Sequence, residues 1–208
     1  MNRVLIIGGA GYIGGITTDV LINKGYSVTV YDNLLYESRY LKNCDFIFGD
    51  ICETDVLVKI HKDFDHIIWL AALVGDGACQ QDPRLTYEIN VNSLKRFLNK
   101  TKRRMIYTST CSVYGAQHDI LDEGSNTNPL SLYASTKLEA EQYVLNSNGL
   151  VFRLGTLYGL GDQYSRIRLD LVVNIMTLRA VYENKLTVFG GKQWRPILYV
   201  GDVAHYID

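Results

Sequence analysis

The residues RVLIIGGAGYIGG at positions 3–15 decide the fold of this chain. The first five form a nearly continuous apolar run, which is typical of a parallel strand that is buried on both faces. A glycine-rich turn follows and opens a helical segment, which Lys24-Gly25 ends. A buried strand, a glycine turn and a helix in this order predict the start of a doubly wound α/β sheet.

The chain beyond this start keeps alternating between the two kinds of element. Strands and helices that alternate in this way predict βαβ units, and therefore a Rossmann-like, doubly wound parallel sheet with helices on both faces. After about residue 160 the rhythm changes to a helix at 167–184, short strands LTVFG (186–190) and PILYVGD (196–202), and the start of a last helix. The earlier strands are expected at 27–32, 45–50, 65–72, 104–110 and 149–159, and the earlier helices at 53–61, 84–100 and 131–147.

Composition excludes several classes of function. The net charge of −1 provides no basic field for nucleic acid or for a membrane surface. The apolar run at 66–74 is strand-sized and too short to span a bilayer. The chain enters its first strand without a signal-peptide pattern, and its four cysteines show neither paired nor metal-ligand spacing. We therefore expect a cytoplasmic protein with reduced thiols and no metal.

The glycine turn has the spacing G-x-x-G-x-x-G at Gly8, Gly11 and Gly14. Such glycines allow a tight turn, close approach of a diphosphate to the backbone, and close contact between helix and strand. Backbone N–H groups at the start of a helix, where its dipole is positive, bind an anionic pyrophosphate. The motif follows a buried strand and opens a helix, so it predicts a dinucleotide site.

Two aspartates end the next strands. Asp32 lies where a carboxylate accepts both adenosine ribose hydroxyls and repels a 2′-phosphate. The glycine loop contains no Lys or Arg, so NAD is favoured over NADP, although Arg39 lies somewhat further on. Asp50 ends the third strand and suits the adenine amino group, but a turn aspartate explains it nearly as well.

A tyrosine and a lysine stand four residues apart in SLYASTKLE, at Tyr133 and Lys137. Residues four apart share one face of a helix, and this pair occurs often by chance. The spacing alone therefore does not distinguish an acid–base pair from a core tyrosine beside a solvated lysine.

The order of the motifs resolves that choice. GGAGYIG, YDN, GD-I, LAA, E-I-N-V-N-S-L, STCSVYG and Y-A-S-T-K occur in this sequence along the chain. The chain resembles an extended short-chain dehydrogenase/reductase of the NAD-dependent epimerase/dehydratase family, typified by UDP-galactose 4-epimerase. RLGTLYG and TVFGGKQWRPILYVGDVA also resemble later segments of that family, so the resemblance covers essentially all 208 residues.

The resemblance implies a role for each matching residue. Tyr133 is expected to exchange a proton with the sugar hydroxyl, and Lys137 to bind the nicotinamide ribose and lower the tyrosine's pKa. Thr110 is expected to hydrogen-bond the same sugar oxygen, while Ser112 and Arg195 are expected at the substrate, Arg195 at its phosphates. The expected cofactor residues are Gly8, Gly11, Tyr12, Ile13, Gly14, Asp32, Asn33, Asp50, Ile51, Leu70, Ala71, Ala72, Asn90, Tyr133 and Lys137.

The reaction favoured by this resemblance is epimerisation of a nucleotide sugar, most plausibly at C4 of a UDP-sugar, through a transient keto sugar. A 4,6-dehydratase of the family has Asp-Glu directly after the Ser/Thr, where this chain has Cys111 and Ser112. Neither side chain supplies that acid–base pair, which argues against dehydration. Two alternatives remain: an NAD(P)-dependent reductase or dehydrogenase of a nucleotide sugar, and an NAD-binding module without activity.

The second alternative arises from length, because members of the family are longer. The resemblance divides the chain into an NAD-binding domain at 1–159 and part of a substrate-binding lobe at 160–208, with a strand returning to the core. It also predicts a homodimer through the helices at 84–100 and 131–147. Apolar residues there serve that interface or pack on the sheet: Leu94, Leu98, Leu138 and Val144.

Overall fold

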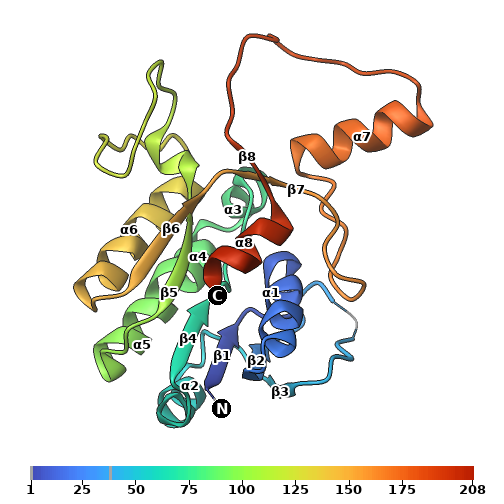
Figure 1. The fold of residues 1–208 in the computed structure, drawn as a ribbon. Coiled ribbons are helices and arrows are strands. Elements are labelled where there is room, and N and C mark those ends of the chain that lie inside the picture. Colours follow the sequence, from blue (N-terminus) through green and yellow to red (C-terminus); the bar gives the residue numbers. More distant parts are fainter. Residues whose placement is uncertain (1, 38) are drawn as a thin grey trace.

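The computed structural model describes residues 2–37 and 39–208. Its main sheet has six strands in the order β3-β2-β1-β4-β5-β6, and every neighbouring pair is parallel (Figure 1). This is the strand order of a Rossmann fold, so the predicted fold class is confirmed. The strands are β1 (Arg3–Ile7), β2 (Ser27–Asp32), β3 (Asp45–Phe48), β4 (His66–Trp69), β5 (Ile106–Thr110) and β6 (Leu150–Leu154).

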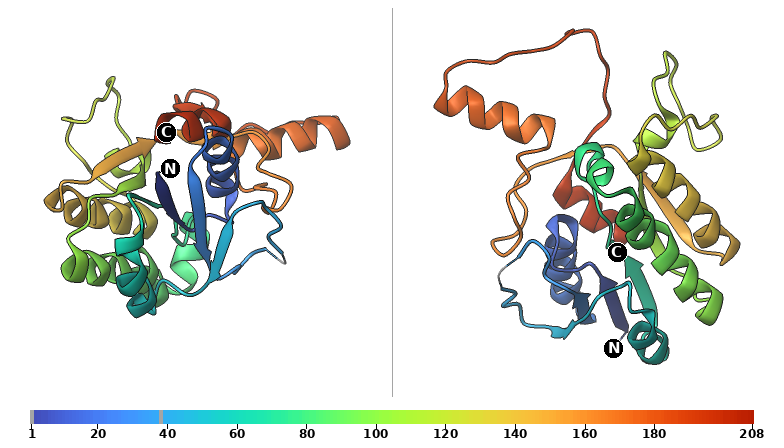
Figure 2. Two further views of the ribbon diagram at one scale, coloured as in Figure 1. Left: turned by 60° about the horizontal axis from the view of Figure 1, so that its bottom comes forward. Right: turned by 180° about the vertical axis from the view of Figure 1, so that it is seen from behind.

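Helices cover both faces of the sheet, and a small parallel pair of strands follows it. Figure 2 shows α1 and α8 on one side and α2, α5 and α6 on the other. The helices are α1 (Tyr12–Asn23), α2 (Thr54–Ile60), α3 (Asp76–Gln81), α4 (Pro83–Tyr87), α5 (Ser93–Thr101), α6 (Leu132–Asn146), α7 (Val172–Tyr182) and α8 (Val200–Ile207). The additional strands are β7 (Thr156–Tyr158) and β8 (Ile197–Tyr199).

Alternation along the strands divides the core into two layers. In β1, Leu5 and Ile7 face α2, α5 and α6, whereas Val4 and Ile6 face α1 and α8. The register continues this division, because Val4 lies opposite Val28 of β2. Both layers are apolar, which explains why the strands read as continuous hydrophobic runs.

Several elements differ from the sequence-based expectations. The helix expected at 84–100 is interrupted by a π-helical turn, Glu88–Asn92, between α4 and α5. The sixth strand is divided at Gly155, where a Cβ would lie 3.0 Å from the carbonyl oxygen of Pro196. The strand expected at 186–190 is wrong, since this stretch is irregular and its side chains are exposed. The short helix α3 and the 3₁₀ turn Cys111–Tyr114 were both unexpected.

The apolar residues that suggested a dimer interface lie mostly inside the protein. Leu94, Leu98 and Val144 are buried in the core layer below α5 and α6, and Leu138 is half-buried. Three of the four therefore pack on the sheet, and the homodimer remains a prediction without support from these residues.

The described residues also contain no helix that is long and apolar enough to cross a membrane. Within the same residues, no cluster of three or more His, Cys, Asp or Glu side chains suits a metal ion. All four cysteines are free thiols. Burial raises the pKa of the Cys79 thiol, and its Sγ donates to the carbonyl oxygen of Leu73. Cys79 therefore has the character of a structural thiol and not of a nucleophile.

Candidate functional site

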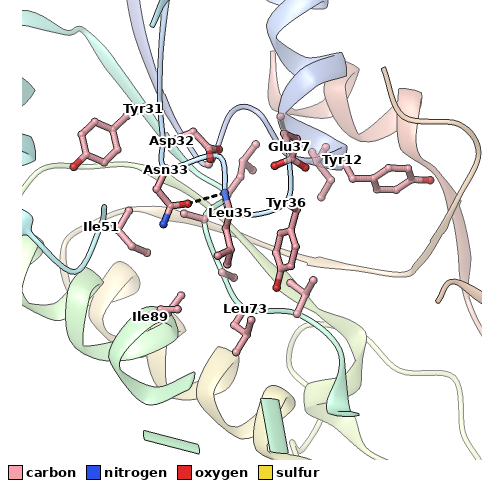
Figure 3. A pocket seen from close by; sticks show the side chains of 18 of the residues that line it. Tyr12, Tyr31, Asp32, Asn33, Leu35, Tyr36, Glu37, Ile51, Leu73 and Ile89 are labelled. Carbon is pink, nitrogen blue, oxygen red and sulfur yellow. Dashed lines mark hydrogen bonds between the residues drawn. The ribbon is translucent and has the colours of Figure 1, made fainter. Parts of the chain in front are cut away.

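A pocket lies at the carboxyl ends of the strands, where the sheet reverses its winding between β1 and β4 (Figure 3). Open α/β sheets bind ligands at this switch point. Turns after β1, β2, β3 and β4 supply most of its wall. Of the expected cofactor residues, those that line it are Gly8, Gly11, Tyr12, Ile13, Gly14, Asp32, Asn33, Asp50, Ile51, Leu70, Ala71 and Ala72.

The three glycines of the turn differ in what an added Cβ atom would contact. Gly8 has φ +84°, and a Cβ on it would lie 2.4 Å from the backbone nitrogen of Ala71. A Cβ on Gly14 would lie 2.6 Å from the carbonyl oxygen of Gly8. A Cβ on Gly11 would meet only that oxygen, at 3.5 Å, and would otherwise enter the pocket. Gly8 and Gly14 are thus required for the close backbone contacts of this turn, whereas Gly11 leaves space for a ligand's phosphates beside the start of α1.

Asp32 ends β2 at the wall of this pocket. Its Oδ2 accepts from the backbone nitrogen of Ala10 at 3.0 Å, and its Oδ1 from that of Leu34 at 2.9 Å. Burial raises the pKa of Asp32, and these backbone hydrogen bonds oppose the shift. Each oxygen keeps a further lone pair, so the carboxylate has the capacity to accept from ribose hydroxyls as well.

Asp50 takes part in a turn and also lies at the pocket. Its Oδ1 accepts from the backbone nitrogen of Cys52 at 2.8 Å, as in a turn, and Asn33 Nδ2 lies 3.3 Å from its Oδ2. The residue also lines the pocket. It therefore stabilises the turn after β3 and lies at the wall of the pocket.

Part of the wall was missed by sequence reasoning. Arg166 and Arg168 reach it from the segment after β7, and Tyr36 and Glu37 from the loop after β2. No local spacing marks these residues, because they meet the glycine turn only through the tertiary fold. The other unexpected wall residues are Tyr31, Leu35, Gly49, Leu73, Val74 and Ile89.

Thr110 stands at the end of β5, at the same edge of the sheet. Its Oγ1 accepts from the backbone nitrogen of Ser112 at 3.1 Å, and its hydroxyl also acts on the neighbouring Cys111 thiol, where it opposes the burial that raises the pKa of that thiol. Cys111 and the exposed Ser112 follow in the 3₁₀ turn. Arg195 is exposed and lies near enough for its charge to oppose the burial that raises the pKa of Cys111. The expected substrate residues thus gather at the end of β5.

Tyr133 and Lys137 occupy successive turns of α6, as their spacing predicts, but their electrostatics differ from expectation. Lys137 is buried, and burial lowers its pKa to about 7 although Glu141 opposes the shift. Burial also raises the pKa of Tyr133, and the charge that opposes this most is Arg168. The Lys137 ammonium lies over the Tyr107 ring, 4.1 Å from its centroid. Neither Tyr133 nor Lys137 belongs to the wall of the pocket.

Asn90 is also placed differently from the expectation of a cofactor contact. It is buried in the π-helical turn, where its Oδ1 accepts from the backbone nitrogen of Leu73 and its Nδ2 donates to the Leu73 oxygen and to Thr136 Oγ1. These bonds use both N–H donors of the amide and one lone pair of its oxygen. Asn90 therefore ties the turn after β4 to α6 and does not line the pocket.

Comparison with known proteins identifies the family. The NAD dependent epimerase/dehydratase family matches residues 4–208, which is nearly the whole chain. The chain belongs to this family. A putative UDP-glucose 4-epimerase from Methanocaldococcus jannaschii is 30% identical over 217 residues, covering 97% of this chain and 70% of that protein. UDP-glucuronic acid decarboxylase 1 from Danio rerio is 27% identical, covering 98% of this chain but 52% of the relative.

Solved structures of the family agree with the fold. The UDP-glucuronic acid 4-epimerase from Bacillus cereus, in complex with UDP-glucuronic acid and NAD, superposes with a TM-score of 0.81 at 26% identity. The match covers 97% of this chain and 70% of that structure. The chain thus spans between about half and 70% of the length of these family members. Their names include both epimerisation and decarboxylation, so family membership alone leaves the reaction open.

Proposed function

We propose that this protein is an NAD-dependent nucleotide-sugar epimerase that acts at C4 of a UDP-sugar. The observation that carries the proposal is the arrangement of Thr110 and Tyr133 at the sheet edge that also holds the glycine turn. A sugar hydroxyl between these residues and a nicotinamide in the pocket would have both a proton acceptor and a neighbouring hydrogen-bond donor. Relatives that are named as UDP-sugar 4-epimerases support the same substrate class.

The residues of the pocket suit NAD. Gly11 leaves room for the diphosphate beside the start of α1, and Asp32 presents a carboxylate to the adenosine ribose. A buried carboxylate at that place repels a 2′-phosphate, which favours NAD over NADP. When bound, NAD supplies the capacity to take a hydride from the sugar and to return it.

The chain's own residues would handle the proton and the alignment. Tyr133 would take the proton of the C4 hydroxyl and later return it, while the Thr110 O–H holds the same oxygen in position. Lys137 lies one helical turn further on α6 and would rise toward the nicotinamide ribose on binding. Burial raises the pKa of Tyr133, so the tyrosine would be neutral near pH 7. The positive charge of a bound nicotinamide ring would favour the phenolate and oppose this shift.

The same site argues against dehydration. Cys111 follows Thr110, and burial raises its thiol pKa, so the thiol is neutral near pH 7. Ser112 is an ordinary hydroxyl with no neighbouring base among its described contacts. Elimination of water needs an acid and a base at the sugar, whereas inversion at C4 needs only oxidation, rotation of the ketone and reduction.

A product assay tests the proposal. The protein is incubated with NAD and, separately, UDP-glucose, UDP-galactose and UDP-glucuronic acid, and the products are separated by chromatography. The expected result is the C4 epimer of at least one sugar without net formation of NADH. Release of carbon dioxide from UDP-glucuronic acid would assign a decarboxylase instead. A lasting rise in NADH would assign a dehydrogenase, and NAD binding without any product would favour the inactive module.

A further inference from the structure

The segment from Leu160 to Leu171, here called the strap, crosses from β7 to α7 beside the pocket. Its start is held by Gly159, whose carbonyl oxygen accepts from Tyr12 Oη at 2.6 Å and from Asn174 Nδ2 at 3.1 Å. Asn174 Nδ2 also donates to the carbonyl oxygen of Arg168 at 3.0 Å. The strap is therefore fixed both to the first turn of α1 and to α7.

A buried ion pair links the start of the strap to the loop between β2 and β3. Lys42 Nζ lies 2.8 Å from Asp162 Oδ2, and both side chains are almost fully buried, at 5% and 6% exposure. The same ammonium donates to the carbonyl oxygen of Gly15 at 2.8 Å. A Cβ on Gly15 would lie 1.8 Å from Asp162 Oδ2, so only glycine permits this contact. Lys42 Nζ also lies 2.6 Å from Asp19 Oδ2 of α1. Separating the strap from Lys42 would therefore leave the buried Asp162 carboxylate without its cation, which favours the observed position of the strap.

The fastened strap brings two guanidinium groups to the wall of the pocket. Arg166 lies over the ring of Tyr36, 3.8 Å from its centroid, and Arg168 lies 5.7 Å from the centroid of the Tyr12 ring. Arg168 donates from Nε and Nη2 to Asp170, which leaves Nη1 without a protein acceptor among the described residues. The Arg166 guanidinium lies over the Tyr36 ring, and its charge acts on the neighbouring Glu37 carboxyl, where it opposes the burial that raises the pKa of Glu37. Both guanidinium groups thus keep donors at the wall of the pocket, and the charge of Arg168 also acts on Tyr133.

We propose that Arg166 and Arg168 bind the diphosphate of the ligand that occupies this pocket, and that the Lys42–Asp162 pair holds them there. The glycine turn approaches such a diphosphate from one side with N–H groups, and the strap approaches it from the other with guanidinium groups. A guanidinium has the planar fork that matches phosphate oxygens. The carboxylates of Asp32 and Asp50 on the same wall suit ribose and adenine, whereas Glu37 lies beside Arg166. Arg166 and Arg168 are the cationic residues of this wall.

The diphosphate has two possible sources, NAD and the sugar nucleotide, and the experiment separates them. NAD and UDP-glucose are titrated separately by calorimetry into the wild type and into the double variant Arg166→Gln/Arg168→Gln, at low and at high salt. Arg179→Gln is the matched control, because it removes the same charge from an exposed position on α7. The double variant Arg166→Lys/Arg168→Lys keeps the charges and tests for rescue.

The glutamine double variant should bind NAD about ten- to a hundredfold more weakly, with a smaller dependence on salt. The lysine double variant should recover part of the affinity, because it restores the charge but not the planar fork, and Arg179→Gln should match the wild type. If only UDP-glucose binding is weakened, the strap binds the diphosphate of the sugar nucleotide. Unchanged affinity for both ligands, or a loss that lysine does not rescue at all, would overturn the proposal. The inference rests on the site of the proposed function, but binding is read without turnover, so failure to find an epimer would not affect it.

Discussion

The ammonium nitrogen of Lys137 lies 4.1 Å from the centroid of the Tyr107 ring, in the interior below α6. Lys137 is 2% exposed, and Glu141 one turn further along the helix opposes the fall in its pKa. To bind the ribose of a cofactor, Lys137 would have to leave this buried position over the Tyr107 ring. The free protein therefore holds this lysine close to the point of losing its charge.

This position gives the stability of the free protein a pH dependence. Burial lowers the pKa of Lys137 to about 7, well below the value of about 10.4 in an unfolded chain. Between these values the unfolded chain binds more protons than the folded protein, so the free energy of unfolding rises with pH. The cost of burying the charged ammonium is fully present below about pH 7. Lys137→Met should remove the penalty. The free energy of unfolding of the variant should exceed that of the wild type, and this difference should fall by about 1 kcal/mol per pH unit between about pH 7 and 9.

Urea denaturation followed by circular dichroism at several pH values measures this difference. The comparison stays below pH 9, because buried tyrosines with raised pKa values, such as Tyr31, affect stability above that range. Parallel pH profiles for Lys137→Met and the wild type would show that the lysine is not desolvated in the free protein.

Replacement of Gly11 by alanine separates binding from folding. The added methyl group meets only the Gly8 oxygen, at 3.5 Å, and otherwise projects into the pocket. We expect a thermal midpoint close to that of the wild type and NAD affinity at least about tenfold weaker, measured by calorimetry. Gly77→Ala is the control, since nothing lies within 4 Å of its Cβ. A variant Gly11→Ala that folds and binds NAD normally would exclude the diphosphate from this place.

The buried pair of Arg153 and Glu141 is expected to stabilise the sheet edge near the site. Arg153 Nη2 lies 2.7 Å from Glu141 Oε2, and the glutamate side chain is 1% exposed. Arg153→Met leaves that carboxylate unpaired and should lower the free energy of unfolding by about 3–5 kcal/mol. The double variant Arg153→Met/Glu141→Leu should recover much of the loss. Equal stability of all three proteins in urea would mean that the pair contributes nothing to the fold.

Replacement of Tyr133 by phenylalanine tests the proton-transfer role. The change removes one hydroxyl from α6 and leaves the wall of the NAD pocket unaltered. Turnover of the UDP-sugar should fall by about two to four orders of magnitude, the range for loss of a general acid–base group. NAD affinity should remain within about twofold of the wild type, measured on the same preparation. Turnover at the wild-type rate would remove Tyr133 from the mechanism.

The parts that could be predicted from the sequence are those whose meaning is local. Gly8 directly follows β1, Gly11 lies in the same turn and Asp32 ends β2, so the order of strand, turn and helix was enough to place them at the pocket. Thr110 and Tyr133 needed the family resemblance, because a tyrosine four residues before a lysine has no meaning by itself.

The remaining parts depend on contacts between distant segments. Arg166 and Arg168 reach the pocket because Lys42 pairs with Asp162, which lies far along the chain. No spacing in the sequence predicts this pair. Asn90 was expected at the cofactor, but the backbone of Leu73 uses its hydrogen-bonding groups. The direction of Lys137 is likewise set by the buried ring of Tyr107 and not by its place on the helix.

The central claim is that the sugar is oxidised and reduced again at C4, and an isotope experiment tests this most directly. UDP-galactose with deuterium at C4 is incubated with the protein and NAD in ordinary water, and the UDP-glucose formed is analysed by nuclear magnetic resonance. The account predicts that the deuterium remains at C4 of the product, because the same hydride leaves and returns. UDP-glucose that carries hydrogen from water at C4 would contradict it.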